Sequence, residues 1–235
     1  MEFSGKKVTV VGTGISGIGA VGLLNAVGAE VVLYDGNEKL KIEDIEKKLG
    51  TYKAEIVLGE LTKELTDSSD LLVISPGVPI DSPVVKAFEA AGVPVWGEVE
   101  LAYAFDKGKV LAITGTNGKT TTTALVGQIV GAYHKDTFVV GNIGNPYTTE
   151  VLKSNKDSYT VAEISSFQLE TVHEFHPLVS AILNITPDHL NRHYTMDCYV
   201  QRNEKIAMNQ KGSEVCVLNF DDDYLREFGE HTTAK

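Results

Sequence analysis

Short apolar runs alternate with longer amphipathic segments along the whole chain. In the first hundred residues, runs rich in β-branched residues predict strands at 7–11, 30–34 and 71–74. The segments between them predict helices at 18–27, 39–49 and 83–91. The rest of the chain repeats this order, with strands expected at 110–114, 137–140, 159–164, 179–185 and 214–219, and helices at 121–133, 166–172 and 196–209. Such alternation is typical of largely parallel, doubly wound sheets covered by helices, so we expect an α/β protein.

A glycine-rich turn follows the first expected strand. It reads Gly12-Thr13-Gly14-Ile15-Ser16-Gly17, and Asp35 ends the second strand 18 residues after Gly17. Glycines permit a tight turn, a helix N-terminus attracts a diphosphate, and an acid at this position can accept a hydrogen bond from a ribose hydroxyl. We therefore expect a Rossmann-like unit that binds a nucleotide diphosphate. A turn without a ligand, or a nicotinamide-dependent dehydrogenase, is the alternative.

A second glycine loop follows the strand expected at 110–114. It reads Gly115-Thr116-Asn117-Gly118-Lys119-Thr120-Thr121. Backbone N–H groups of such a loop hold anionic oxygens, the lysine adds positive charge, and the hydroxyl after it can bind Mg²⁺. The common phosphate-binding loop would need glycine at position 113, where this chain has Ile113, so the loop is a shortened form. We expect a P-loop ATPase-type α/β domain that uses ATP and Mg²⁺. The alternative is a turn before a threonine-rich helix, with no bound phosphate.

The two glycine loops divide the chain. We expect a Rossmann-like domain at residues 1–107 and an ATP-binding domain at residues 108–235, because Asp106-Lys107-Gly108-Lys109 reads as a polar connection between them. The two segments are not sequence repeats, although each begins with a strand and a glycine loop. This division predicts two separate ligand sites, one at the start of each unit.

Composition narrows the function classes. The 235 residues are 43% hydrophobic and 23% charged, with a formal net charge of −11. That balance is typical of a globular chain and disfavours nonspecific binding to nucleic acid or to an anionic membrane. The two cysteines have no metal-binding spacing, no apolar run approaches the roughly 18 residues of a membrane span, and the N-terminus has no signal-peptide pattern. We expect a cytoplasmic protein with no nucleic-acid or membrane partner.

Polar residues stand at the ends of the later strands. Asn142, Glu163 and His189 each follow or end an expected strand of the second unit. The carboxyl ends of parallel strands share one edge of a sheet, so we expect Glu163 and His189 to converge with Lys119 and Thr120. A carboxylate there would complete the coordination of Mg²⁺ beside a triphosphate. A structural pair of Glu163 with an arginine, and a purely structural role for His189, are the alternatives.

Taken together, the motifs resemble those of the ATP-dependent Mur ligases of peptidoglycan synthesis. The resemblance extends from about Lys7 to Asp222. It rests on six runs: 75–79 (SPGVP), 97–101 (GEVEL), 115–121 (GTNGKTT), 141–144 (GNIG), 163–170 (EISSFQLE) and 184–190 (NITPDHL). The run at 163–170 favours the D-glutamate-adding branch of the family.

The resemblance implies an activity and a set of site residues. It implies that D-glutamate is joined to UDP-N-acetylmuramoyl-L-alanine at the expense of ATP, through an acyl phosphate. It assigns UDP-sugar binding to Ile15, Ser16, Asp35, Gly77, Asn142 and His189, and ATP binding to Gly115, Thr116, Asn117, Gly118, Lys119, Thr120 and Thr121. It also assigns catalysis to Lys119 and His189, and Mg²⁺ to Thr120, Glu163 and His189.

Two departures from the family pattern bear on activity. The resemblance implies a third domain that binds the amino acid and completes the ATP site, and this chain ends before it. The family carries a carbamylated lysine 14 residues after the motif histidine, where this chain has Asn203, and Lys205 lies about 200° around a helix from that position. We expect a truncated ligase, inactive alone or completed by a separate C-terminal fragment; a UDP-sugar- and ATP-binding module without ligase activity is the alternative.

We also expect the strand near 215–218 to expose an apolar edge that promotes association.

Overall fold

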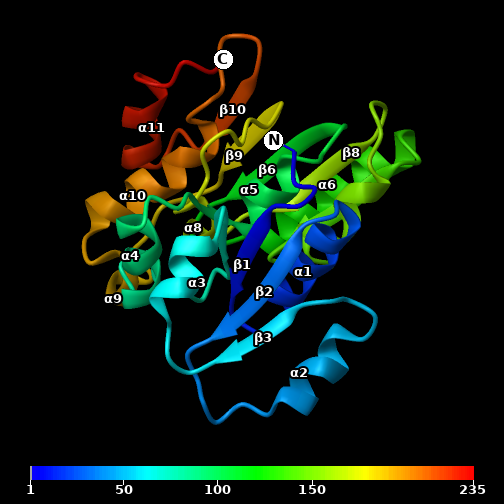
Figure 1. Cartoon of the computed structure of the whole chain (residues 1–235). Coiled ribbons are helices and arrows are strands. Elements are labelled where there is room, and N and C mark those ends of the chain that lie inside the picture. Colours follow the sequence, from blue (N-terminus) through cyan, green and yellow to red (C-terminus); the bar gives the residue numbers. More distant parts are fainter. Residues whose placement is uncertain (1) are drawn as a thin grey trace.

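Two five-stranded sheets form the framework of the molecule (Figure 1). The computed structural model describes residues 2–235. The first sheet has the strand order β3-β2-β1-β4-β5 and the second has the order β10-β9-β6-β8-β7. Every strand pair within the two sheets is parallel. The expected α/β class with parallel sheets is therefore confirmed.

The first sheet and its helices are formed by the N-terminal part of the chain. Its strands are β1 (Lys7–Val11), β2 (Glu30–Asp35), β3 (Glu55–Leu58), β4 (Leu71–Ile74) and β5 (Val95–Gly97). Its helices are α1 (Ile15–Ala26), α2 (Ile42–Leu49), α3 (Lys63–Ser68), α4 (Pro83–Ala90) and α5 (Glu98–Tyr103). Helix α1 begins three residues earlier than expected, because the second half of the glycine turn is already helical and Gly14 is its N-cap.

The second sheet contains the phosphate-type loop. Its strands are β6 (Lys109–Thr114), β7 (Thr137–Gly141), β8 (Tyr159–Glu163), β9 (Val179–Ile182) and β10 (Val215–Leu218). Its helical segments are α6 (Lys119–Tyr133), α7 (Tyr147–Glu150), η1 (Val151–Lys153), α8 (Ser166–Leu169), α9 (Leu190–His193), α10 (Met196–Glu204), η2 (Lys205–Ala207) and α11 (Asp223–Gly229). Strand β9 stops three residues short of its expected end, because Asn184 and Thr186 bond to the phosphate-type loop instead of continuing the sheet.

One hydrophobic core extends across both sheets. A single cluster of buried side chains includes Val10 and Leu101 of the first unit and Val110 and Ala162 of the second. Helices α1 and α5 of the first unit pack on α7 of the second. The glycine turn after β1 faces Asn145, Pro146 and Thr149 of the second unit across a cavity that both units line.

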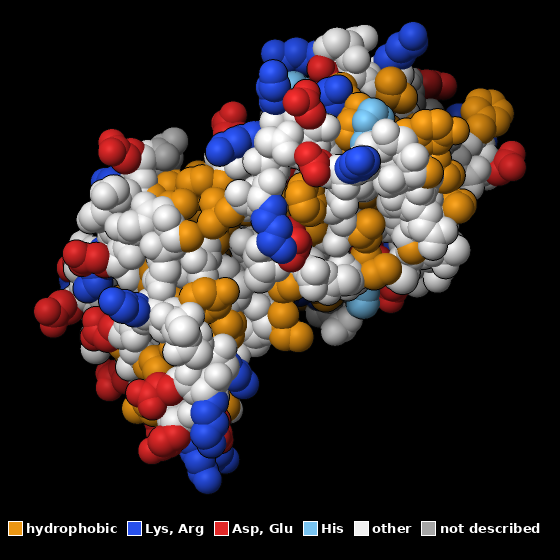
Figure 2. Space-filling model, turned by 90° about the vertical axis from the view of Figure 1, so that its right-hand side faces the viewer, with side chains coloured by type: hydrophobic (Ala, Val, Ile, Leu, Met, Phe, Trp, Pro, Cys, Tyr) orange, Lys and Arg blue, Asp and Glu red, His pale blue; other side chains and the backbone are white. Residues whose placement is uncertain are grey.

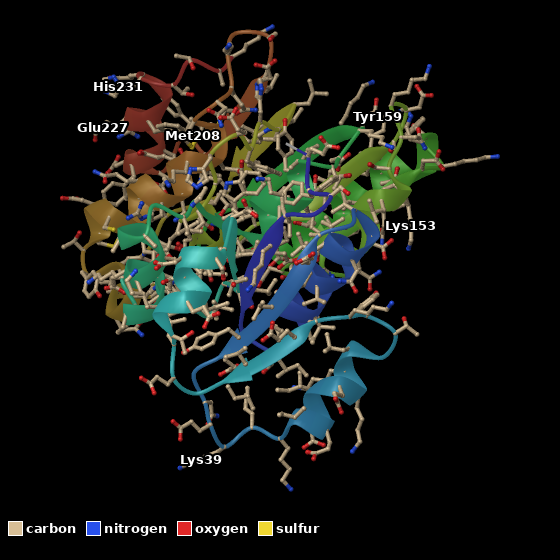
Figure 3. The ribbon with its side chains drawn as sticks, viewed as in Figure 1. Lys39, Lys153, Tyr159, Met208, Glu227 and His231 are labelled. Carbon is tan, nitrogen blue, oxygen red and sulfur yellow. The ribbon has the colours of Figure 1, made fainter. Side chains whose placement is uncertain are left out.

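The two ends of the molecule differ in character. Lys39, in the loop before α2, lies at one end, and Glu227 and His231, in and after α11, lie at the other (Figure 3). Charged side chains gather over α2 at the lower end in Figure 2, whereas more hydrophobic side chains appear on the upper part of that face. Within residues 2–235, no helix has the length and apolar character needed to cross a membrane.

Candidate nucleotide and phosphate site

The glycine turn after β1 is fixed by its own backbone. Gly12 has a φ of +103°, and a Cβ on Gly17 would lie 1.9 Å from the carbonyl oxygen of Gly12. Gly14 is different, because a Cβ there would have no neighbour within 4 Å. The hydroxyl of Thr13 donates to Oδ2 of Asp35 at 3.1 Å. The structure thus brings the expected acid against the turn and leaves the turn open at Gly14.

A cavity of about 520 Å³ separates this turn from the second unit. Its walls come from both units: Thr13, Gly14, Ile15, Ile18, Gly19, Lys48, Tyr52, Asn145, Pro146 and Thr149. Ile15 is 79% exposed at its rim. Ser16 does not line the cavity; its side chain faces the buried carboxyl of Glu98. Gly77 lies in the exposed loop after β4, where a Cβ would also meet nothing within 4 Å.

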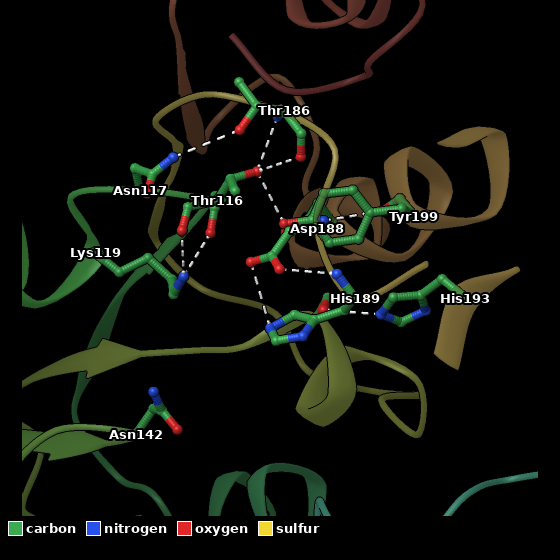
Figure 4. Close-up of polar contacts among 12 residues, drawn as sticks. Thr116, Asn117, Lys119, Asn142, Thr186, Asp188, His189, His193 and Tyr199 are labelled. Atoms are coloured by element: carbon green, nitrogen blue, oxygen red, sulfur yellow. Dashed lines mark hydrogen bonds and ion pairs between the residues drawn. The ribbon is translucent and has the colours of Figure 1, made fainter. Parts of the chain in front are cut away.

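The loop between β6 and α6 has the form of an anion-binding loop. Gly115 and Gly118 adopt φ values of +129° and +85°, which favour glycine. Helix α6 is 15 residues long and begins at Lys119, directly after the loop. The Lys119 ammonium donates to the carbonyl oxygens of Gly115 at 2.7 Å and Thr116 at 2.9 Å (Figure 4). Backbone N–H groups, a helix N-terminus and a cation therefore lie together, which is the chemistry that holds phosphate oxygens.

The segment after β9 holds this loop in shape. Asn184 accepts from the N–H of Asn117 at 2.9 Å through Oδ1, and its Nδ2 donates to the Asn117 carbonyl at 3.0 Å. The Thr116 hydroxyl accepts from the N–H of Thr186 at 2.9 Å and lies 2.9 Å from the Tyr199 hydroxyl (Figure 4). Sequence reasoning gave Asn184 and Tyr199 no role. Asn184 is the first residue of the run 184–190 that carries the family resemblance, and this run was the signal that could have identified it.

Glu163 ends β8 with a buried, half-satisfied carboxylate. The residue is 1% exposed, its Oε1 accepts from Nδ2 of Asn142 at 2.8 Å, and its Oε2 has no hydrogen-bond partner. The expected alternative of an arginine partner is wrong within the described part of the chain, because the carboxylate forms no ion pair there. Burying a carboxylate oxygen without a hydrogen-bond partner costs folding free energy. A bound divalent cation would supply the missing partner. The residues present therefore fit Mg²⁺.

Other protein ligands for such a cation are sparse. Across residues 2–235, no group of three or more His, Cys, Asp or Glu side chains forms a metal cage. Thr120 is exposed in the first turn of α6, which follows β6, the strand next to β8 in the sheet. Mg²⁺ is commonly held by one or two protein ligands together with water and substrate phosphates, so this sparse set is compatible with it.

His189 lies beyond β9, on the other side of β6 from Glu163. It has a φ of +52°, and its Nε2 is 3.5 Å from Oδ2 of Asp188. Its ring packs against Phe167 with a centroid separation of 4.8 Å. His193 is instead buried, with Nε2 2.9 Å from the Ser166 hydroxyl, and burial lowers the pKa of His193. Because β6 pairs with both β8 and β9, Lys119 lies between the strand ends that carry Glu163 and His189.

Position 203 is part of the packed interior beneath the loop. The Asn203 side chain is fully buried, accepts from the Thr114 hydroxyl at 3.0 Å and donates to the Tyr199 carbonyl at 2.9 Å. Lys205 does not take its place, because its ammonium donates to the Glu170 carbonyl at 2.9 Å. The cationic or carbamylated group that the family resemblance implied at 203 is therefore replaced by a neutral, satisfied amide.

Known family descriptions match most of the chain. The family description "Mur ligase middle domain" matches residues 113–235, and "Mur ligase MurD-like, N-terminal domain" matches residues 6–97. A relative from Lachnospira eligens, named UDP-N-acetylmuramoylalanine--D-glutamate ligase, is 67% identical over 234 residues, which cover 100% of this chain and 52% of the relative. A relative of the same name from Lachnoclostridium phytofermentans is 57% identical over 227 residues, covering 96% of this chain and 50% of the relative. The chain thus spans about half the length of the curated relatives it matches.

Solved structures share the fold. A UDP-N-acetylmuramate:L-alanyl-gamma-D-glutamyl-meso-diaminopimelate ligase from Neisseria meningitides has a TM-score of 0.63 at 17% identity, covering 99% of this chain and 78% of that chain. A murein peptide ligase from Psychrobacter arcticus has a TM-score of 0.58 at 16% identity, covering 98% of this chain and 52% of that chain. At these identities the likeness concerns the arrangement of the two sheets and not the ligands.

Proposed function

Because the chain belongs to the Mur ligase family, we propose that it forms the UDP-sugar- and ATP-binding part of a cytoplasmic ligase. The proposed reaction joins D-glutamate to UDP-N-acetylmuramoyl-L-alanine with ATP as the second substrate. The residues proposed for D-glutamate and for the adenine side of ATP belong to the half that the relatives have and this chain does not match.

The proposal assigns the two halves of the reaction to the two units. Residues 1–107 would hold the uridine nucleotide along Ile15, Asp35 and Gly77, with Ser16 fixed behind them. Residues 108–235 would hold the triphosphate on the loop 115–121. The cavity between the glycine turn and α7, which both units line, supports a ligand that spans them.

In the proposed chemistry the acyl carboxylate attacks the γ-phosphorus of ATP and ADP leaves. The amine of D-glutamate then attacks the acyl carbon, phosphate leaves, and the amine loses a proton. Lys119 would move from the carbonyls of Gly115 and Thr116 to the transferring phosphoryl group and offset its charge, because catalysis of this kind is mostly positioning and electrostatic stabilisation. Asn142 and His189 would contact the sugar and acyl end. Glu163 and Thr120 would hold one Mg²⁺ and His189 a second, and these ions would supply further charge neutralisation at the phosphates.

The observation that carries the proposal is the unpartnered Oε2 of Glu163 next to the strand that leads into an anion-binding loop. Its test is the variant Glu163→Gln, which keeps an acceptor for Asn142 and removes the charge. We expect calorimetry to show MgATP affinity reduced about tenfold, roughly 1.4 kcal/mol, with metal-free ADP bound equally by both proteins. The matched control is Glu64→Gln, in the exposed first turn of α3. Equal MgATP affinity in the two variants would refute the role of Glu163.

A second candidate function is UDP-sugar and ATP binding without ligation. The observation that favours it is Asn203, which is buried and fully hydrogen-bonded where the family resemblance implies a carbamylated lysine. Phosphate release from ATP with UDP-N-acetylmuramoyl-L-alanine, measured with and without D-glutamate, separates the two. Release that requires D-glutamate supports the ligase, and binding of both nucleotides without release supports the binding module.

A further inference from the structure

Arg192 joins three segments that are far apart in the sequence. Its guanidinium makes two hydrogen bonds to the Glu170 carboxylate after α8, one of them from Nε to Oε1 at 3.2 Å. It also donates to the carbonyl oxygen of Val78, in the loop after β4 of the first unit, at 3.0 Å. The side chain of Arg192 is 13% exposed and that of Glu170 is 3% exposed. A largely desolvated, bidentate pair of this kind holds its partners in one geometry.

The same guanidinium also contacts the surroundings of His189. It lies 4.9 Å from the centroid of the Phe167 ring, and the ring of His189 packs on Phe167 at 4.8 Å. The backbone N–H of Arg192 donates to the carbonyl of His189 at 2.8 Å, which closes the single turn of α9. Arg192 therefore constrains both the backbone and the aromatic support of His189.

The turn that carries Arg192 has an unusual backbone. His189 and Tyr194, on either side of it, have φ values of +52° and +67°, and they are the only non-glycine residues with positive φ among those described. Such conformations persist where the surroundings over-determine them. Tyr194 supplies a second tie to the first unit, because its hydroxyl donates to the Asp81 carboxylate. The loop that contains Gly77 is thus attached to this turn at two points, Val78 and Asp81.

We propose that Arg192 is a positioning residue that sets the Gly77 loop of the first unit against His189 of the second. The inference rests on the proposed function, in which these two sites hold opposite ends of the UDP-sugar. Without the guanidinium fork, the two ends of the ligand would still meet their own residues, but not at a fixed separation. Lysine cannot replace arginine here, because an ammonium has neither the planar fork nor the stacking face.

The test is the ratio of two affinities, measured by calorimetry on the full chain. UDP-N-acetylmuramoyl-L-alanine reaches both ends of the proposed site, whereas UDP reaches only the glycine-turn end. For Arg192→Lys we expect the affinity for the complete ligand to fall about tenfold and the affinity for UDP to change by less than about threefold. Glu170→Gln, which removes the charge that Arg192 engages, should reproduce this split. Arg226→Lys, an exposed arginine paired with Asp223 in α11, is the matched control.

The outcomes are separable from those of the proposed function. If the unaltered chain binds neither ligand, the proposed function fails and this inference fails with it. Suppose the unaltered chain binds both ligands. If Arg192→Lys then lowers both affinities by the same factor, or changes neither affinity, only the positioning role is overturned. A purely structural role would lower the melting temperature without changing the affinity ratio, so thermal unfolding of each variant is recorded alongside.

Discussion

At the scale of single residues, Gly14 and Gly77 are glycines for no reason that the fold supplies. Neither has a positive φ, and a Cβ at either would meet no atom within 4 Å. Gly17 is the opposite case, because its Cβ would collide with the Gly12 carbonyl. A glycine that packing does not require leaves the backbone open to the close approach of a ligand when it lies beside a binding site. This supports a ligand path along Gly14 and Gly77.

The variant Gly77→Ala tests that path. We expect its melting temperature to be unchanged or slightly raised, because alanine stabilises by about 0.4–1 kcal/mol where the backbone accepts it. We expect its affinity for UDP-N-acetylmuramoyl-L-alanine to fall about tenfold, measured by calorimetry. Gly212→Ala, equally open but in the turn before β10, should leave the affinity unchanged. Undiminished binding by Gly77→Ala would show that the loop does not approach the ligand.

At the scale of elements, Asp222 connects the last helix to the phosphate-type loop. The sequence reads residues 221–223 as a solvated helix start, and the structure confirms that α11 begins there. Asp222 caps the helix by accepting from the N–H groups of Tyr224 and Leu225. Its other oxygen accepts from the N–H of Ile185 at 2.6 Å, in the segment that holds the loop 115–118. The cap thus also fixes the support of the proposed ATP site.

We expect Asp222→Ala to destabilise the protein by about 2 kcal/mol, because it removes a helix cap and a charge-assisted hydrogen bond. That loss corresponds to a fall in melting temperature of roughly 5 °C for a chain of this size. Asp221→Ala is the control, since its side chain is exposed and caps nothing. Denaturant unfolding that gave the two variants equal stability would contradict the tertiary role of Asp222.

At the scale of the whole molecule, buried carboxylates join the two units. Glu98 of α5 is 3% exposed and accepts from the N–H of Tyr147 in α7 at 3.1 Å. Glu100 accepts from three consecutive backbone N–H groups at 173–175. These bonds cross from one sheet to the other, so the units are held together by polar contacts within a shared core.

The Glu98 carboxyl predicts a dependence of stability on pH. Burial raises the pKa of Glu98 above its ordinary value of 4.5. A carboxyl whose pKa is raised by folding contributes its full stability below pH 4.5 and loses it as the pH rises through the folded value. Glu98→Gln should therefore gain stability relative to the unaltered chain as the pH rises from 4.5 toward 8. Glu89→Gln, exposed on α4, should show no such gain in melting curves recorded across that range.

The exposed face of β10 predicts association. Val215 and Val217 point to the same side of this edge strand and are 37% and 54% exposed. Lys235 covers part of the strand's outer edge through backbone hydrogen bonds to Glu214 and Cys216, but not the apolar face. We expect light scattering after size exclusion to show self-association that increases with concentration and decreases in Val217→Lys. Ser213→Lys adds the same charge off the strand; equal behaviour of the two variants would rule out this face.

Local pattern was sufficient to predict most of the fold. The β-branched runs form strands of parallel sheets, which are covered on both faces. Such strands are continuous hydrophobic runs, so their positions can be predicted from the sequence. The short helices α7 and α9 were not expected, because one turn of helix has no periodicity and is stabilised only by tertiary contacts such as those of Glu98 and Arg192. The ends of β9 and α8 were overestimated for the same reason.

The sequence by itself determined the two glycine loops, the strand-end position of Glu163 and the family, because each depends on residue types at fixed spacing, whereas His189 lies seven residues beyond the end of β9. The division at residue 107 and the role of each site residue stay predictions. Only the tertiary structure decided that Glu163 meets Asn142 and not an arginine, that Asn203 is satisfied in the core, and that Arg192 joins the units. These contacts span 21 to 114 residues, and no local pattern specifies which distant atoms a buried polar group will meet.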